Sequence, residues 1–92
     1  MNANDQPPGT HIDFDAPCEL RKWPSLNNQR RCDSVPYLVL ASTLQECIRE
    51  FMAKPSCTRH LYEIHTSPQP PLVSAILSAE IVPELARLRD FL

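Results

Sequence analysis

The clearest pattern of apolar and polar positions predicts a helix that begins near Thr43. Leu44 is followed by apolar residues at spacings of three, four, seven and eight, which places them on one face of a helix: Cys47, Ile48, Phe51 and Met52. Thr43 and Glu46 have the spacing of a capping box, which satisfies free backbone N–H groups at a helix start. Pro55 disfavours helical geometry at the residue before it, so we expect the helix to end there.

Three short β-prone runs predict strands around this helix. Residues 37–40 are apolar and follow Pro36, which suits the entry to a strand. Residues 59–66 contain β-branched and aromatic residues without a breaker, and residues 72–77 are apolar on both faces, as in a central strand. The intervening segment 67–71 is rich in proline, which cannot donate to a β-ladder, so it must leave the sheet.

A second helix is expected after Ser78, at the end of the chain. Leu85, Leu88 and Leu92 form its apolar stripe. Pro83 complicates its start: either residues 79–82 form a separate turn and Pro83 lies in the first turn proper, or the helix kinks there.

The predicted order of elements is β-α-β-β-α, which defines a small compact α+β domain over residues 35–92. The simplest way to bury both apolar stripes is a three-stranded sheet with the two helices on one face. Strands 37–40 and 59–66 are joined through a helix, so we expect them to pair in parallel if they are neighbours. A core of this size is marginal by itself, and a second copy of the chain is one way to cover what it leaves exposed.

Residues 1–34 are predicted to form a proline-rich, flexible and largely irregular N-terminal arm. This arm holds the chain's one tryptophan and three of its arginines, which we take as candidate partner-binding residues: Trp23, Arg21, Arg30 and Arg31. One interpretation is a nucleic-acid contact, in which the arginines touch phosphates and Trp23 stacks on a base. The interpretation we favour is an arm that packs Trp23 on the core, because neighbouring acidic residues cancel most of the positive charge of the arginines.

The composition narrows the class of protein. The chain has 92 residues, enough for one domain, and a net charge of −2, unlike the strongly positive footprint of a typical nucleic-acid binder. No apolar run approaches the length of a membrane span, and residues 1–8 lack the features of a signal peptide. We therefore expect a cytoplasmic protein with no membrane association, whose four cysteines are free thiols.

A metal- or thiol-based site at Cys57, His60 and His65 is one alternative, with Cys47 as a fourth candidate ligand. The spacing disfavours it, because His60 and His65 are five residues apart on a predicted strand and so point to opposite faces. The same residues supply a thiol and an imidazole for nucleophilic catalysis, but the sequence has no nucleophile-elbow or glycine-rich loop beside them. We expect no enzymatic activity and no cofactor.

From Leu40 to the C-terminus the chain also resembles the Phd/YefM antitoxin type. The residues that carry the resemblance are Ala41-Ser42-Thr43-Leu44, the run from Leu61 to Thr66, and Ala75 to Glu80, with Ile76-Leu77-Ser78-Ala79-Glu80 the closest match. This resemblance implies a homodimer that binds operator DNA and neutralises a toxin.

Two functional hypotheses from different classes follow. The first is a small non-enzymatic protein-interaction module or accessory subunit, with self-association as the expected contact. The second is the antitoxin-like DNA-binding transcriptional regulator, which requires a positive face built from Arg49, Arg59 and the arginines of the arm.

Overall fold

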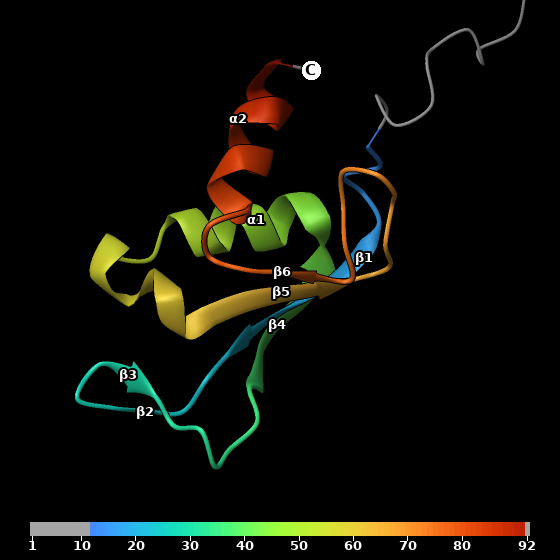
Figure 1. Cartoon of the computed structure of the whole chain (residues 1–92). Coiled ribbons are helices and arrows are strands. Elements are labelled where there is room, and N and C mark those ends of the chain that lie inside the picture. Colours follow the sequence, from blue (N-terminus) through green and yellow to red (C-terminus); the bar gives the residue numbers. More distant parts are fainter. Residues whose placement is uncertain (1–11, 92) are drawn as a thin grey trace, which may run out of the picture.

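The computed structural model describes residues 12–91, which form an α+β fold (Figure 1). One antiparallel sheet has the strand order β4-β1-β5-β6, with β1 at Pro17–Lys22, β4 at Tyr37–Thr43, β5 at Tyr62–Thr66 and β6 at Ile76–Leu77. A small hairpin pairs β2 (Ser25–Leu26) with β3 (Gln29–Arg30). The helices are α1 (Leu44–Met52), the 3-10 helix η2 (Ser56–Leu61) and α2 (Val82–Phe91).

The α+β class is confirmed, but the prediction of three strands behind an irregular arm is wrong in detail. β1 comes from the segment assigned to the arm and lies inside the sheet, between β4 and β5. It therefore separates the two strands that were expected to pair in parallel. The physical reason is an alternation in β1: Cys18 and Leu20 are buried against the helices, while Glu19 and Arg21 point to the other face.

Helix α1 is confirmed, and so is its N-terminal cap. The Thr43 hydroxyl accepts a hydrogen bond from the backbone N–H of Glu46 at 3.2 Å. The predicted apolar stripe faces the sheet, and four of its residues are buried: Leu44, Cys47, Ile48 and Phe51. The helix ends at Met52, before Pro55, as the sequence predicts.

The two later strands are shorter than predicted. Residues 56–61 coil into the 3-10 helix η2, so that the strand expected over 59–66 begins only at Tyr62. The strand expected over 72–77 is reduced to Ile76–Leu77, and it lies at the edge of the sheet instead of the centre. Upstream of β6, Gln69 and Val73 exchange backbone hydrogen bonds and close a turn around the two prolines between them.

Both long helices lie on the same face of the sheet (Figure 1), as expected from the apolar stripes. Helix α1 packs on β1, β4 and β5, and α2 packs against α1. Residues 79–81 form a turn before α2, so Pro83 sits in the first turn of that helix and does not kink it. The largest fully buried side chains of this core are Phe51, Leu20, Leu44, Ile48, Ile64 and Leu77. The other face of the sheet carries no helix in the part of the chain described.

None of the helices over residues 12–91 combines the length and the apolar character that crossing a membrane requires.

Candidate functional site

The helix-free face of the sheet carries a row of polar side chains. In the strand register, Glu19 of β1 lies opposite His65 of β5, and Arg21 lies opposite Glu63. Trp23 follows β1 with the same alternation, and its backbone N–H donates to the Leu61 carbonyl at 2.7 Å. We call this surface the open face, defined by Glu19, Arg21, Trp23, Glu63 and His65.

Glu63 is the centre of the open face and the one buried charged residue among those described, with 7% of its surface exposed. The Trp23 indole Nε1–H donates to its Oε1 at 2.8 Å, and His65 Nε2 lies 2.5 Å from its Oε2. The guanidinium of Arg30 lies 3.9 Å away. Burial raises the pKa of Glu63, but the contacts with Trp23, His65 and Arg30 outweigh burial and hold that pKa below its usual value. The carboxylate is therefore charged at neutral pH.

The β2–β3 hairpin is fixed onto this cluster. Asn27 and Asn28 form its two-residue turn with φ angles of 53° and 61°, a left-handed geometry that asparagine tolerates better than other non-glycine residues. The Asn28 side chain donates to the Cys57 carbonyl at 2.9 Å, and the Arg30 Nε–H donates to the His60 carbonyl at 2.7 Å. These bonds attach the hairpin to η2, a long-range contact that the sequence pattern does not reveal.

The structure brings three of the four candidate partner-binding residues together. Arg30 lies over the Trp23 ring, 5.4 Å from its centroid, beside Glu63. Arg21 is on the same face and donates to Glu19 Oε1 through both Nε (2.9 Å) and Nη2 (2.6 Å). Arg31 is separate from them, paired with Asp33 at 2.9 Å in an exposed turn.

The three candidate metal ligands have separate surroundings. Cys57 is an exposed thiol in η2, and His60 Nε2 lies 2.6 Å from the carbonyl oxygen of Asn28. His65 belongs to the open face, where its ring contacts Glu63. Over residues 12–91, no group of three or more His, Cys, Asp or Glu side chains is arranged to hold a metal ion.

Two further cysteines, Cys18 and Cys47, meet inside the core between β1 and α1. Both thiols are free and buried. Their mutual hydrogen bond and burial raise the pKa of Cys18 far above its ordinary value, so its thiol stays protonated at neutral pH. Cys18 therefore acts as a small apolar residue of the core, as does Cys47 on the apolar face of α1.

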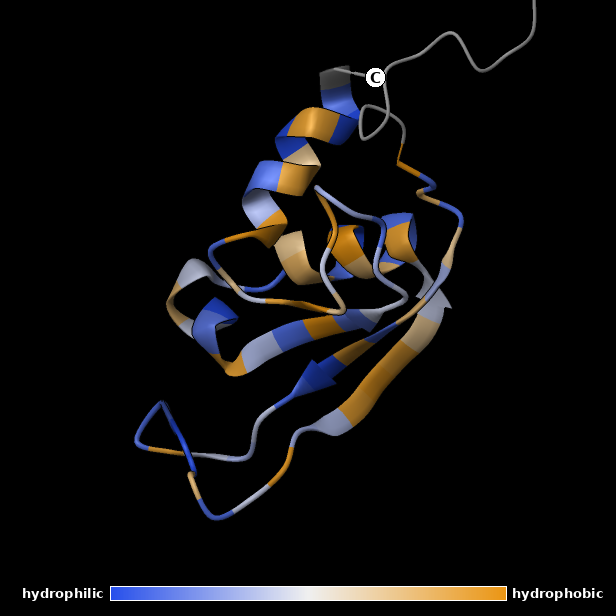
Figure 2. Ribbon diagram, turned by 45° about the vertical axis from the view of Figure 1, so that its right-hand side comes forward, coloured by the Kyte–Doolittle hydropathy of each residue, from blue (hydrophilic) through white to orange (hydrophobic). Residues whose placement is uncertain are grey.

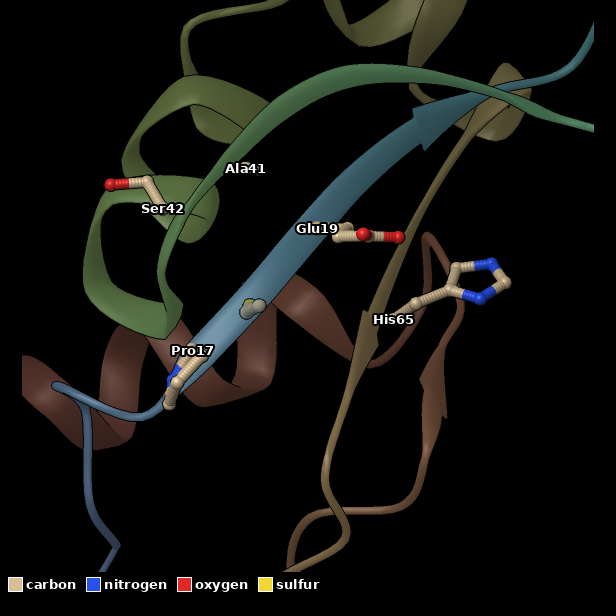
Figure 3. Close-up of a pocket in the computed structure, with 6 residues that line it drawn as sticks. Pro17, Glu19, Ala41, Ser42 and His65 are labelled. Carbon is tan, nitrogen blue, oxygen red and sulfur yellow. The ribbon is translucent and has the colours of Figure 1, made fainter.

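A hollow of about 450 Å³ lies over one end of the open face (Figure 3). Its lining residues are Pro17, Cys18, Glu19, Ala41, Ser42 and His65. Figure 3 shows the side chains of Glu19 and His65 projecting from neighbouring strands on the same side. Glu19 is already bonded to Arg21 and His65 to Glu63, so the two ionisable side chains of this hollow have partners within the chain.

The outer strand β4 carries an exposed apolar surface. Figure 2 shows it as a largely hydrophobic ribbon along the outer margin of the sheet. The exposed side chains are Tyr37, Leu38 and Val39 of the strand and Val35 shortly before it, which together we call the β4 surface. β4 pairs with β1 alone, so within the described residues its other edge has no strand beside it.

The arginines do not form a free positive face. Arg49 pairs with Glu46 at 3.0 Å, and Arg59 donates to the carbonyls of Met52 (2.8 Å) and Lys54 (3.2 Å). The remaining arginines also contact acidic side chains: Arg21, Arg30, Arg31, Arg87 and Arg89. Acidic partners therefore offset the charge of every arginine on which the DNA-binding hypothesis depends except Arg59, whose guanidinium donors are engaged by backbone carbonyls.

Comparisons with models of known families, with characterised proteins and with solved structures gave no match for this chain.

Proposed function

We propose that this chain is a small, non-enzymatic protein-interaction module that binds its partner through β4. The observation that carries the proposal is that β4 is a seven-residue edge strand without a single charged side chain. A sheet edge presents a row of unpaired N–H and C=O groups, which is a template for pairing with another chain.

Protein edge strands are usually protected by short length, by charge or by an internal proline. β6, at the opposite edge, follows this rule because it has only two residues. β4 does not: its one proline neighbour, Pro36, precedes it, and Tyr37, Leu38 and Val39 remain exposed. The asymmetry between the two edges favours β4 as the binding edge.

The open face supports a binding role over a catalytic one. A general acid or base must have a free position from which to move a proton to a substrate. Here both oxygens of Glu63 are engaged, one by the Trp23 indole N–H and the other by His65, and the carboxylate lies 3.9 Å from Arg30 of the β2–β3 hairpin. We infer that this cluster gives the module a rigid polar surface next to the apolar edge.

The DNA-binding alternative has weaker support. Its candidate residues Arg49 and Arg59 are held by Glu46 and by backbone carbonyls. Binding a phosphate would require these contacts to be given up, which reduces the gain from each new contact.

The test is a matched pair of charge substitutions in the full-length chain, Val39→Lys and Ile81→Lys. Both positions hold an apolar residue that is about equally exposed, at 38% and 42%, but only Val39 is on β4. We expect cross-linking in cells to show a partner, including a second copy of the chain, that Val39→Lys loses at least tenfold and Ile81→Lys retains. Equal partner capture by the two variants would contradict a role for β4.

A further inference from the structure

We propose that the partner of β4 is a second copy of this chain, and that the two β4 strands pair antiparallel around a two-fold axis at Ala41. This inference rests on the proposed function, because it identifies the occupant of the same edge. It joins two four-stranded sheets into one continuous sheet.

The register follows from a β-bulge in β4. Leu20 lies opposite Leu40, but the next residue of β1, Arg21, lies opposite Leu38, so Val39 is an extra residue. Strict alternation of side chains between the two faces is therefore broken at Val39. From Val39 to Thr43 the alternation is regular, since Ala41 shares the open face with Glu19, and Leu40 shares the core face with Leu20.

Residues that oppose each other in a sheet must point to the same face. When two copies of β4 are aligned antiparallel, a centre at Ala41 satisfies this rule over all of Val39–Thr43. Leu40 then lies opposite Ser42 on the core face, and Val39 lies opposite Thr43 on the open face. A centre at Leu40 would instead place Leu38 opposite Ser42. Leu38 points to the open face and Ser42 to the core face, so this register is excluded.

Charge and size also favour a second copy at this edge. No residue between Asp33 and Glu46 is charged, so two identical strands meet without like charges in opposition. The small Ala41 side chains lie at the axis, where the two copies approach most closely. The flanking pair of Val39 and Thr43 is β-branched on both sides, a combination that packs well across strands.

The chain's own N-terminal segment is a poor alternative occupant of this edge. Residues 1–11 are mostly polar and contain Pro7, Pro8 and Gly9. Proline cannot donate to a ladder, and glycine has no side chain to pack against Val39 or Thr43. The other possible occupant is an edge strand of an unrelated protein, which disulfide trapping and sedimentation distinguish from a second copy of this chain.

The expected dimer is reversible. Each copy contributes five residues to the new ladder, a small interface by the standards of permanent dimers, so we expect a dissociation constant on the order of 10 μM. Because Ala41 and Ser42 line the hollow beside the open face, the hollows of the two copies meet across the axis. The dimer therefore presents a doubled, symmetric concave surface.

Disulfide trapping tests the register directly. In a full-length chain whose exposed Cys32 and Cys57 are changed to serine, Ala41→Cys places one thiol of each copy at the axis. Opposed residues of antiparallel strands have Cα atoms about 4.5 to 5.5 Å apart, within the range that a disulfide spans. Ile76→Cys, which is 54% exposed on the opposite edge strand, is the control.

We expect Ala41→Cys to form a covalent dimer at least tenfold faster than Ile76→Cys under mild oxidation at 50 μM protein. Sedimentation of the unmodified chain should show the mean mass rising from monomer toward dimer between about 1 and 100 μM. Equal trapping rates, together with a monomer at every concentration, would overturn self-pairing. If Val39→Lys still abolishes capture of a different protein in that case, the binding role of β4 stands, whereas failure of both experiments rejects both proposals.

Discussion

Replacing Glu63 with alanine tests whether the open face is a structural cluster that fixes the β2–β3 hairpin. The substitution removes the acceptor of the Trp23 indole N–H at 2.8 Å and the partner of His65 at 2.5 Å. It also removes the negative charge that lies 3.9 Å from Arg30. We therefore expect the hairpin to loosen from η2 and the whole fold to lose stability.

The magnitude follows from these contacts. A hydrogen bond to a charged group contributes about 1.5 to 3 kcal/mol, and Glu63 makes two. The side chains of His65 and Arg30 are 30% and 38% exposed, so water replaces part of what they lose. The Glu63→Ala variant also no longer pays the desolvation cost of burying a carboxylate, which offsets part of the loss. The free energy of unfolding should consequently fall by about 2 to 3 kcal/mol.

Urea denaturation, followed by far-ultraviolet circular dichroism at pH 7, measures this change. Glu50→Ala is the matched control, because Glu50 is half-exposed on α1 and its one ion pair within residues 12–91 is with Lys54, just beyond the end of that helix. That variant should lose no more than about 0.5 kcal/mol. Equal losses for the two variants would refute the structural role of Glu63.

The difference in stability between the parent chain and Glu63→Ala is predicted to depend on pH. Because the pKa of Glu63 is lower in the folded chain than its ordinary value of 4.5, its contribution to stability is fully present above about pH 4.5. That contribution is lost as the pH falls through the lower folded pKa. The stability difference between the parent and Glu63→Ala should shrink when the pH is lowered from 7 to 3.5, and an unchanged difference would contradict the lowered pKa.

Two further predictions concern the scaffold. Leu20→Ala should cost about 2 to 5 kcal/mol in urea denaturation, because Leu20 is fully buried within the sheet; a loss below about 1 kcal/mol would mean that β1 is not a core strand. Thr43→Ala should cost about 1 kcal/mol by removing the cap of α1, whereas its neighbour Ser42→Ala should be close to neutral, and the same denaturation assay distinguishes them. Equal effects of these two substitutions would show that the Thr43 cap does not stabilise the helix.

Local signals in the sequence were sufficient for the two α-helices, although not for the 3-10 helix η2. The apolar spacing after Leu44, the cap at Thr43 and the stop before Pro55 all act within one or two turns, and α1 has those bounds. Pro83 is likewise compatible with only the first turn of a helix, which is where α2 places it. Such elements are determined by neighbours close in the chain.

The sheet required information from residues far apart in the chain. The alternation from Cys18 to Arg21 is short and lies between Pro17 and Pro24, so it is easily taken for an irregular segment. It becomes a strand because β4 and β5 pair with both of its edges, and both are distant in sequence. The available signal for a strand was the spacing of the apolar residues Cys18 and Leu20, which are two positions apart.

The candidate site likewise combines residues that the sequence singled out with others that only the fold brings together. Trp23 and Arg30 stand out in the sequence as an aromatic and a cationic side chain, and they do meet on the open face. Glu63 was missed, although a carboxylate inside the β-prone run Tyr62-Glu63-Ile64 is a recognisable signal for a buried, partnered charge. The exposed edge of β4 was not foreseen, because only the placement of β1 decides which strand is outermost.

Amide hydrogen exchange of β4 at two protein concentrations measures whether two copies of the chain pair through this strand. The amides of Val39–Thr43 that point away from β1 have no partner strand among residues 12–91 of a single copy, but they gain one in the proposed dimer. We predict that their exchange slows at least fivefold between 2 and 200 μM protein, while the amides of β5 are unchanged. Exchange at β4 that is equally fast at both concentrations would contradict the pairing of two copies through this strand.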